Sequence, residues 1–194
     1  PVVYFATETL EGCKSGVMVT ASHNGPEFNG FKCIMQGRAR TEEDIQAIRQ
    51  RIEKNRFYSG EGEEKRHDVT ADYVDTIFAD VALAGDVSVV IDAGNGVTGK
   101  VAPKLFEELG CETTCINCDL DGTFPSHGPD PTKPENLQQL IDKVTEIGAD
   151  FGVAFDGDGD RLVVVTNSGQ IIWPDRLLML FAKDILARNP GADV

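Results

Sequence analysis

The chain has 194 residues, of which 41% are hydrophobic, and its formal net charge at pH 7 is -14. This composition is ordinary for a globular protein, and the acidic charge argues against nucleic acid as a partner, because phosphate backbones are bound by basic surfaces. No apolar run reaches the roughly 20 residues of a transmembrane helix, so we expect no membrane partner. Because the chain opens on proline within an apolar run, we expect a fragment or a processed chain.

The first third of the chain predicts a small α/β unit followed by a linker. Residues 16–20 are typical of a short buried strand, which leads into a polar loop at 21–26, and residues 31–35 resume as a strand. A helix is expected from Thr41 to about residue 51, because Thr41 and Asp44 resemble a capping box. Residues 54–67 are charged and contain glycine, which favours a linker.

From residue 70 onward, predicted helices and strands alternate, which indicates a layered α/β domain. The last predicted helix has an apolar face but few partners left in the chain, so we expect it to begin a further unit. The helices are expected at residues 70–84, 97–109, 134–147 and 174–187, and the strands at 87–91, 112–117, 151–155, 162–165 and 171–173.

The chain has five cysteines, an odd number. Cys111, Cys115 and Cys118 are close enough in sequence to suggest a metal site, but no second cluster at zinc spacing accompanies them. We therefore expect reduced thiols, which are typical of a cytoplasmic protein.

Residues 155–161 read FDGDGDR and are the most informative segment of the chain. Its three carboxylates, on Asp156, Asp158 and Asp160, would repel one another by about 4 kcal/mol per pair at about 4 Å and an effective dielectric constant of about 20. The two glycines between them let the backbone turn sharply, so that all three carboxylates can face one point. Carboxylate oxygens are hard ligands, and the segment therefore predicts a Mg²⁺ or Ca²⁺ site.

Two other interpretations of this acidic loop are weaker. An EF-hand starting at Asp156 would need glycine and glutamate at its sixth and twelfth positions, where the chain has Arg161 and Asn167. A solvated acidic turn would not need the apolar strands expected on both sides, which put the loop at the end of a sheet, where ligands bind. Arg161 can instead grip a phosphate beside the metal, which suggests phosphoryl transfer.

A further candidate ligand lies in the polar loop after the first predicted strand. A phosphate on Ser22 would bring a charge of about -2 and three acceptor oxygens, which could complete the metal's coordination. His23 or Lys32 could serve as acid or base for a sugar hydroxyl. Taken alone, the loop could equally be a turn with no chemistry, because serine and asparagine favour such turns.

Together these segments resemble the α-D-phosphohexomutase family, and within it the bacterial members that act on mannose and glucose phosphates. Residues 16–24 (GVMVTASHN) are similar to the family's phosphoserine loop, and residues 29–32 (NGFK) to the segment that follows it. Residues 155–161 are similar to its metal loop, and residues 121–136 resemble a stretch of its second domain. The resemblance covers essentially the whole chain.

The resemblance implies an intramolecular phosphotransferase of the isomerase class, with Mg²⁺ as its cofactor and a phosphosugar as its substrate. The phosphate would be carried by a serine and passed to the sugar, and a 1,6-bisphosphate would form as the intermediate. The implied catalytic residues are Ser22, His23, Lys32 and Arg161, and the implied metal ligands are Ser22, Asp156, Asp158 and Asp160.

The family has four domains, and the resemblance implies an α/β fold for this chain, with three-layer α/β/α domains and mixed sheets. The resemblance implies that residues 1–67 are the C-terminal part of the first domain, 68–170 the second, and 171–194 the start of the third. The family's sugar-recognition loop in the third domain and its phosphate-binding loop in the fourth have no counterpart here, so we expect weak or no activity from this chain alone. We also expect a cytoplasmic protein and a monomer. Gly25 stands where the family usually has proline, which loosens the loop.

Two alternatives stay open beside a mutase. Residues 94–100 (GNGVTGK) match the G-x-G-x-x-G pattern of a dinucleotide site, and nearly match a Walker A motif, although Val101 stands where that motif needs serine or threonine. A chain without the sugar-reading segments could also be a non-catalytic metal- or phosphate-binding module. His67 and His127 are expected to be structural or exposed.

Overall fold

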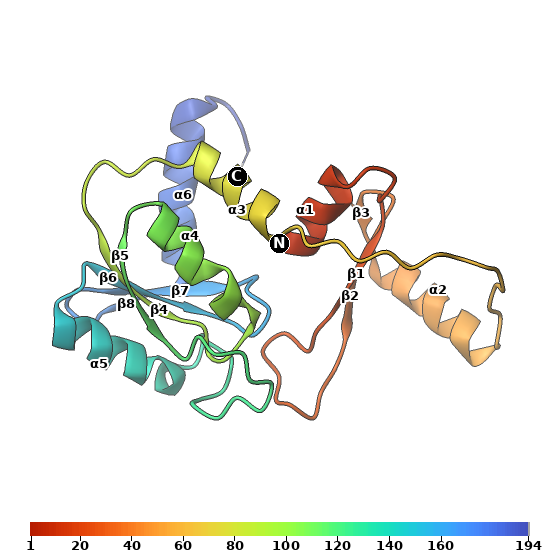
Figure 1. The fold of residues 1–194 in the computed structure, drawn as a ribbon, viewed down its shortest axis with the longest axis horizontal. Helices are drawn as coiled ribbons and strands as arrows, with labels where there is room; N and C mark the ends of the chain where they lie inside the picture. The colour runs from red at the N-terminus through yellow and green to blue at the C-terminus, as the bar shows by residue number, and fades with distance from the viewer. Residues whose placement is uncertain (194) are drawn as a thin grey trace. The chain divides into compact units, whose positions relative to one another are not determined.

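A computed structural model describes residues 1–193 and divides the chain into two compact units (Figure 1). The first unit contains residues 1–20 and 30–76, and the second contains residues 21–29 and continues from Ile77 onward. The loop at residues 21–29 therefore belongs to the second unit, although the strands before and after it belong to the first. Ser22 and His23 thus share a unit with the acidic loop, whereas Lys32 lies in the other unit.

The first unit is built on an antiparallel sheet with the strand order β1-β2-β3. Lys32 lies on β2, opposite Met18 of β1. The elements of this unit before its last helix are α1 (Val2–Thr9), β1 (Gly16–Val19), β2 (Phe31–Met35), β3 (Arg38–Ala39) and α2 (Glu42–Glu53).

Helix α1 packs closely on strand β1 because the strand opens with a glycine. A Cβ on Gly16 would lie 2.8 Å from Val3 and 2.9 Å from Thr7, so a larger residue would push the helix away. The strand itself is only half covered: Val17 and Val19 are 52% and 58% exposed. The prediction of a buried strand here is therefore wrong, since one of its faces has no covering layer within its own unit.

The helices that follow begin where the sequence predicts. The hydroxyl of Thr41 accepts from the amide of Asp44 at 3.4 Å, and the Asp44 carboxylate accepts from the amide of Thr41 at 3.2 Å, which confirms the capping box of α2. Helix α3 (Thr70–Asp80) ends four residues earlier than expected. Its first amide, on Thr70, donates to the side chain of Asp68 at 2.9 Å, so Asp68 satisfies one of the amides that have no partner within the helix.

The second unit contains a five-stranded mixed sheet with the order β5-β4-β6-β7-β8. Strand β4 runs parallel to β5 and β6, while β6–β7 and β7–β8 are antiparallel pairs. The strands are β4 (Ser88–Asp92), β5 (Glu112–Ile116), β6 (Phe151–Phe155), β7 (Leu162–Thr166) and β8 (Ile171–Ile172), and the helices are η1 (Val97–Lys100, a 3₁₀ helix), α4 (Ala102–Glu108), η2 (Pro134–Leu137, also 3₁₀), α5 (Gln138–Ile147) and α6 (Pro174–Arg188).

Both faces of this sheet are covered, which makes the unit a three-layer α/β/α structure. Val90 of β4 packs with Leu140 of α5, whereas its neighbours Val89 and Ile91 pack with Ala102 of α4. Because successive side chains of a strand point to opposite faces, α4 and α5 lie on opposite sides of the sheet (Figure 1). The predicted α/β class with three layers and a mixed sheet is confirmed.

Some predicted elements differ in detail. The single helix expected at residues 97–109 is divided into η1 and α4, and a Cβ on Gly99, at the end of the first turn, would overlap the carbonyl oxygen of Cys118. Helix α1 and strand β3 were not predicted. The domain boundaries expected at residues 67 and 170 stay a prediction.

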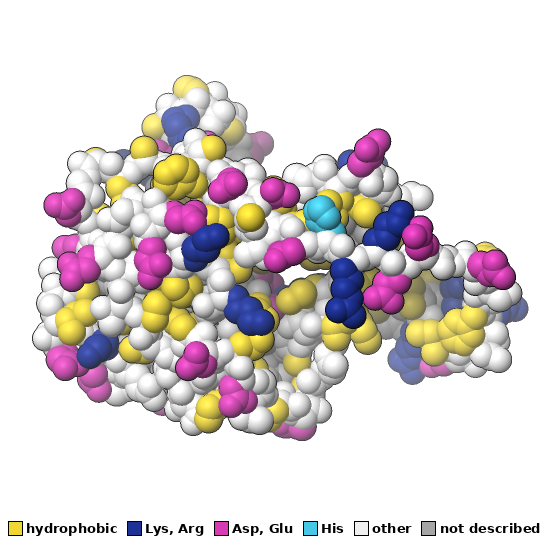
Figure 2. Space-filling view, in the orientation of Figure 1, with side chains coloured by type: hydrophobic (Ala, Val, Ile, Leu, Met, Phe, Trp, Pro, Cys, Tyr) yellow, Lys and Arg dark blue, Asp and Glu magenta, His cyan; other side chains and the backbone are white. Residues whose placement is uncertain are grey.

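On the face shown in Figure 2, the acidic side chains are dispersed. In Figure 2, acidic side chains are spread over the visible face and alternate with lysines and arginines, so the charge does not gather in one patch. Within residues 1–193, every helix is too short or too polar to cross a membrane.

Candidate metal and phosphoserine site

The acidic loop connects two antiparallel strands, β6 and β7, and is folded around the carboxylate of Asp156. The amide of Asp156 donates to the carbonyl of Arg161 at 3.2 Å, which closes the loop. The Asp156 Oδ1 accepts from the amides of Asp160 and Arg161 at 3.0 and 3.1 Å. One buried side chain therefore holds the backbone of the whole loop.

The three aspartates of the loop gather as the sequence predicts. One carboxylate oxygen from each of Asp156, Asp158 and Asp160 lies within 4.8 Å of the other two. Asp156 is fully buried, Asp158 is 7% exposed, and burial raises the pKa of the Asp156 carboxyl. Burial disfavours the charged carboxylate, and a cation bound among these hard oxygen ligands would offset that cost. The donor set therefore fits Mg²⁺.

The cysteines do not form a comparable cluster. Among residues 1–193, the three aspartates are the one group of three or more potential ligand side chains whose atoms could share an ion. All five cysteines are free. Burial raises the pKa of the Cys118 thiol to about 12, so this thiol stays protonated at neutral pH.

Ser22 meets the acidic loop although 134 residues separate it from Asp156. Its hydroxyl donates to Asp156 Oδ2 at 3.1 Å and accepts from Arg161 Nη2 at 2.6 Å. The same guanidinium lies 2.8 Å from Asp156 Oδ2 and 3.4 Å from an oxygen of Asp160. The serine hydroxyl is thus held between a carboxylate and a guanidinium.

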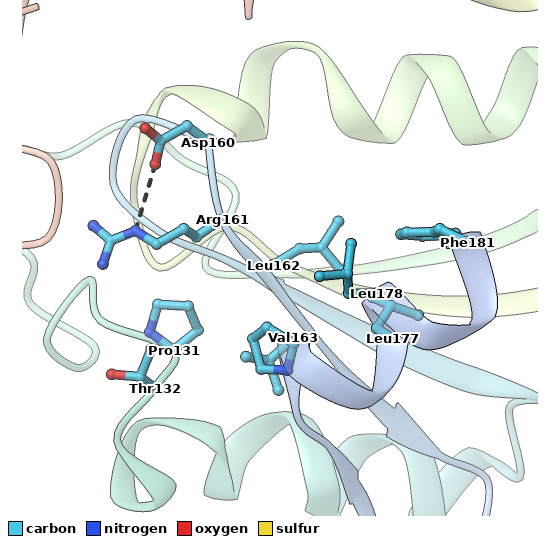
Figure 3. A pocket seen from close by; sticks show the side chains of 10 residues that line it. Pro131, Thr132, Asp160, Arg161, Leu162, Val163, Leu177, Leu178 and Phe181 are labelled. Atoms are coloured by element: carbon cyan, nitrogen blue, oxygen red, sulfur yellow. Dashed lines mark ion pairs between the residues drawn. The ribbon is translucent and has the colours of Figure 1, made fainter. Parts of the chain in front are cut away.

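His23 and Arg161 complete the immediate surroundings of this hydroxyl. The Nδ1 of His23 lies 3.3 Å from Ser22 Oγ and is also in contact with Arg161 Nη2. Arg161 stands at one end of a pocket, and Figure 3 shows its guanidinium extending away from the apolar side chains of Leu177 and Phe181. The positive charge therefore faces the serine rather than the apolar end of the pocket.

The backbone at Ser22 adopts a conformation that non-glycine residues rarely use, with φ at 57°. Its carbonyl oxygen lies against the acidic loop, at a point where a Cβ on Gly157 would overlap it. Strained residues of this kind persist when the surrounding structure fixes them, and they cluster at functional sites. The glycine thus admits the serine loop into close contact with the acidic loop.

The glycine-rich segment at residues 94–99 packs against the same loop from another side. The amide of Val97 donates to the carbonyl of Gly157 at 3.2 Å, and a Cβ on Gly96 would lie 2.7 Å from that oxygen. In the same way, the backbone carbonyl of Cys118 fills the space that a side chain at Gly99 would need. These glycines allow backbone to pack on backbone, which gives the G-x-G-x-x-G pattern a structural reason without a nucleotide.

Two family models match the chain. The model described as phosphoglucomutase/phosphomannomutase, alpha/beta/alpha domain II, matches residues 71–169, and the corresponding domain I model matches residues 1–59. The chain belongs to the phosphoglucomutase/phosphomannomutase family. The resemblance read from the serine and acidic loops is thereby confirmed, and close relatives named as such mutases make the family one of isomerases.

Relatives and solved structures agree with this family. A phosphomannomutase/phosphoglucomutase of Pseudomonas aeruginosa is 56% identical over 194 residues, which is 100% of this chain and 42% of that protein. A phosphoglucomutase of Neisseria gonorrhoeae is 49% identical, again over 100% of this chain and 42% of the relative. A crystal structure of a family member from Burkholderia thailandensis has a TM-score of 0.93 and 49% identity, covering 97% of this chain and 43% of that one. The chain thus spans less than half the length of these mutases.

Of the residues assigned from sequence, the second unit brings together Ser22, His23, Arg161 and the three aspartates. Lys32 lies in the first unit, and its role as an acid or base stays a prediction. Sequence reasoning missed the pair formed by Asp92 and His127, whose atoms lie 3.0 Å apart near this site. The sequence does contain a signal for Asp92, because this residue ends the apolar strand β4, and ligands of α/β sheets bind at the carboxyl ends of the strands.

Proposed function

We propose that this chain carries the metal- and phosphate-binding part of a hexose phosphate mutase. The observation that carries the proposal is the placement of the Ser22 hydroxyl, 3.1 Å from Asp156 Oδ2 and 2.6 Å from Arg161 Nη2. A phosphate on this oxygen would enter a site that already contains a guanidinium, a ring nitrogen and three carboxylates. Membership of the mutase family and the names of the relatives support the same reaction.

Mg²⁺ would be held by Asp156, Asp158 and Asp160 together with an oxygen of the serine phosphate. When bound, Mg²⁺ would neutralise negative charge on the phosphoryl group while it is transferred. The cluster of hard oxygen atoms within 4.8 Å supports this ion.

Different residues of the chain would then have different roles in phosphoryl transfer. In the first half-reaction the bond between phosphorus and Ser22 Oγ breaks, and a bond from phosphorus to a sugar hydroxyl oxygen forms. The proton of that hydroxyl passes to His23 or Lys32, and Ser22 Oγ, which leaves with the electron pair, takes up a proton and becomes the free hydroxyl. Arg161 would hold the phosphate through paired N–H donors. The resulting 1,6-bisphosphate turns over and returns its other phosphate to Ser22, so phosphate moves between C1 and C6 of mannose or glucose.

A non-catalytic metal- or phosphate-binding module is the second candidate. The observation that favours it is length, because the chain covers 42% of the Pseudomonas aeruginosa mutase. Turnover of mannose 1-phosphate by the isolated chain separates the two candidates. Formation of mannose 6-phosphate, or phosphorylation of Ser22 without turnover, supports the mutase part, and the absence of both supports the non-catalytic module.

The decisive experiment follows the phosphate itself. The chain is incubated with glucose 1,6-bisphosphate and Mg²⁺, and its intact mass and peptide map are compared with those of a Ser22→Ala variant. One added phosphate on Ser22, absent from the variant, is the expected result. A phosphate on another residue, or none, contradicts the proposal.

The metal assignment has its own test. We expect the triple substitution of Asp156, Asp158 and Asp160 by asparagine to remove Mg²⁺ binding measured by titration calorimetry, because amides carry no charge to hold the ion. Unchanged Mg²⁺ affinity in this variant would show that the loop assignment is wrong.

We also propose a cytoplasmic enzyme that acts as a monomer and binds neither nucleic acid nor membrane. The five free cysteines support a reducing compartment, and the net charge of -14 disfavours binding to phosphate backbones.

A further inference from the structure

The segment from His127 to Asp130 is tied to the sheet by a buried ion pair. His127 Nε2 lies 3.0 Å from Asp92 Oδ2, and His127 Nδ1 lies 2.9 Å from the carbonyl oxygen of Gly128. Asp92 is fully buried at the end of β4, and the His127 side chain is 12% exposed. The sequence alone predicts a structural or exposed histidine at this position.

The hydrogen-bond partners define the charge of this pair. A carbonyl oxygen and a carboxylate can only accept, so both ring nitrogens of His127 must donate, which requires the imidazolium form. The carboxylate of Asp92 also accepts from the amide of Gly94 at 2.9 Å and from Asn117 Nδ2 at 3.1 Å. The hydrogen bond to Asp92 raises the pKa of His127, in keeping with this form. A buried carboxylate thereby acquires the counter-charge it needs.

The anchored segment lies directly behind the acidic loop. A Cβ on Gly94 would be 3.4 Å from His127 Cε1 and 3.7 Å from Pro129 Cα, so the end of β4 and this segment are in close contact. Pro129 in turn backs the acidic loop: a Cβ on Gly157 would be 3.4 Å from Pro129 Cβ and would overlap the carbonyl of Ser22. Pro129 and Ser22 therefore contact the acidic loop at the same residue.

The far end of the segment is anchored independently. The Asp130 carboxylate accepts from the amide and hydroxyl of Thr132 at 3.1 and 2.7 Å, and its carbonyl accepts from Asn136 Nδ2 at 2.8 Å. Burial opposes the charge on Asp130, but the two hydrogen bonds from Thr132, with the nearby side chains of His23 and Lys133, hold the pKa of its carboxyl below the ordinary value. Two anchors, one at each end, therefore fix Pro129 between them.

We propose that His127 is a positioning residue: paired with Asp92, it fixes Pro129 behind Gly157 and so holds the acidic loop in the arrangement that binds Mg²⁺ beside Ser22. The inference rests on the proposed function, because it concerns the same metal site. It assigns to the pair an effect on metal affinity in addition to its effect on folding. Outer residues that orient metal ligands typically change metal affinity by about 10–100-fold when they are replaced.

The test compares Mg²⁺ binding by the unchanged chain with that of His127→Ala and His127→Gln. Glutamine can still donate one hydrogen bond to Asp92 but carries no charge. We expect Mg²⁺ dissociation constants that rise about tenfold or more in His127→Ala, with His127→Gln between that variant and the unchanged chain. His67→Ala is the matched control, since His67 is exposed in the first unit, and it should bind Mg²⁺ like the unchanged chain.

Titration calorimetry on samples shown to be folded by circular dichroism separates positioning from stability. A merely structural role would lower stability and leave the affinity of the folded chain unchanged. Unchanged affinity in both variants overturns the inference while the metal site stands, and if His127→Ala does not fold, unchanged affinity in His127→Gln alone overturns it. An unchanged chain that binds no Mg²⁺ overturns the proposed metal site, and this inference with it.

Discussion

At the scale of single residues, Gly157 is the position where the serine loop and the acidic loop meet. A Cβ there would overlap the Ser22 carbonyl and lie 3.4 Å from Pro129 Cβ. Because neither backbone can yield without moving the site, we expect Gly157→Ala to lower the free energy of unfolding by about 1–3 kcal/mol. The measurement is urea denaturation followed by circular dichroism.

The control for this substitution is Gly122→Ala. A Cβ on Gly122 would meet nothing within 4 Å, so the same added methyl group should change stability by less than about 0.5 kcal/mol. Equal stability of the two variants would contradict the close contact between Gly157 and Ser22.

His127 should make the stability of the second unit depend on pH. The hydrogen bond to Asp92, opposed in part by burial and reinforced by the Gly128 carbonyl, raises the pKa of its imidazole. Since the folded pKa lies above the unfolded one, the pair stabilises the fold fully below the unfolded value of about 6.5. This stabilisation is lost as the pH rises through the folded value.

His127→Asn, which cannot be protonated, isolates this contribution. Free energies of unfolding are measured by urea denaturation without Mg²⁺ at several pH values between about 6 and 9, and the value for the variant is subtracted. We expect the advantage of the unchanged chain to shrink toward the alkaline end, while titrations common to both proteins cancel. A difference that stays constant or grows with pH would contradict the charged pair.

At the scale of elements, helix α2 depends on local interactions because none of its residues is buried. Thr41→Ala removes the hydroxyl that accepts from the amide of Asp44, and we expect a cost of about 1 kcal/mol to the helix. Hydrogen exchange of amides 45–53 should therefore be about fivefold faster. Thr41→Ser keeps the acceptor and should leave exchange unchanged; equal acceleration in both variants would argue against the cap.

The elements that the sequence predicts are those encoded locally. Strands β4, β6 and β7 are short apolar runs, of which β4 and β7 are rich in β-branched residues, and the capping box of α2 lies within four positions. The break between η1 and α4 was not predictable in this way, because Gly99 packs against the Cys118 carbonyl 19 positions later. The sequence pattern did not predict the exposed face of β1 for the same reason. Whether a face of a strand is covered depends on elements elsewhere in the chain, which the pattern of the strand does not reveal.

The candidate site shows the same division. The sequence predicts that Ser22 and Asp156 share a site because of their chemistry. A cluster of carboxylates needs a cation, and a phosphate on the serine can complete the coordination shell of that cation. The chemistry of Asp92 and His127 does not require a partner in this way, since each residue alone is ordinary for a strand end or a loop. The position of Asp92 at the end of β4 is a signal for one member of the pair, and the hydrogen bonds at both ring nitrogens of His127 reveal the pair itself.

At the scale of the whole chain, the two compact units should respond differently to Mg²⁺. All three aspartates of the acidic loop and Ser22 belong to the second unit. An ion that binds only the folded form stabilises it by about 2.7 kcal/mol at a concentration one hundred times its dissociation constant. That stabilisation should appear in the second unit, which contains the ligands, and not in the first.

Hydrogen exchange followed by mass spectrometry distinguishes the units within one sample. At saturating Mg²⁺, the slowest amides of β4 and β6 should exchange about a hundredfold more slowly, because 2.7 kcal/mol is about a factor of 100. Amides of β1 and β2 should be unaffected. In the variant with all three aspartates replaced by asparagine, Mg²⁺ should change neither unit. Equal protection of both units by Mg²⁺ would mean that they unfold together, and protection that survives in the variant would mean that the ion binds elsewhere.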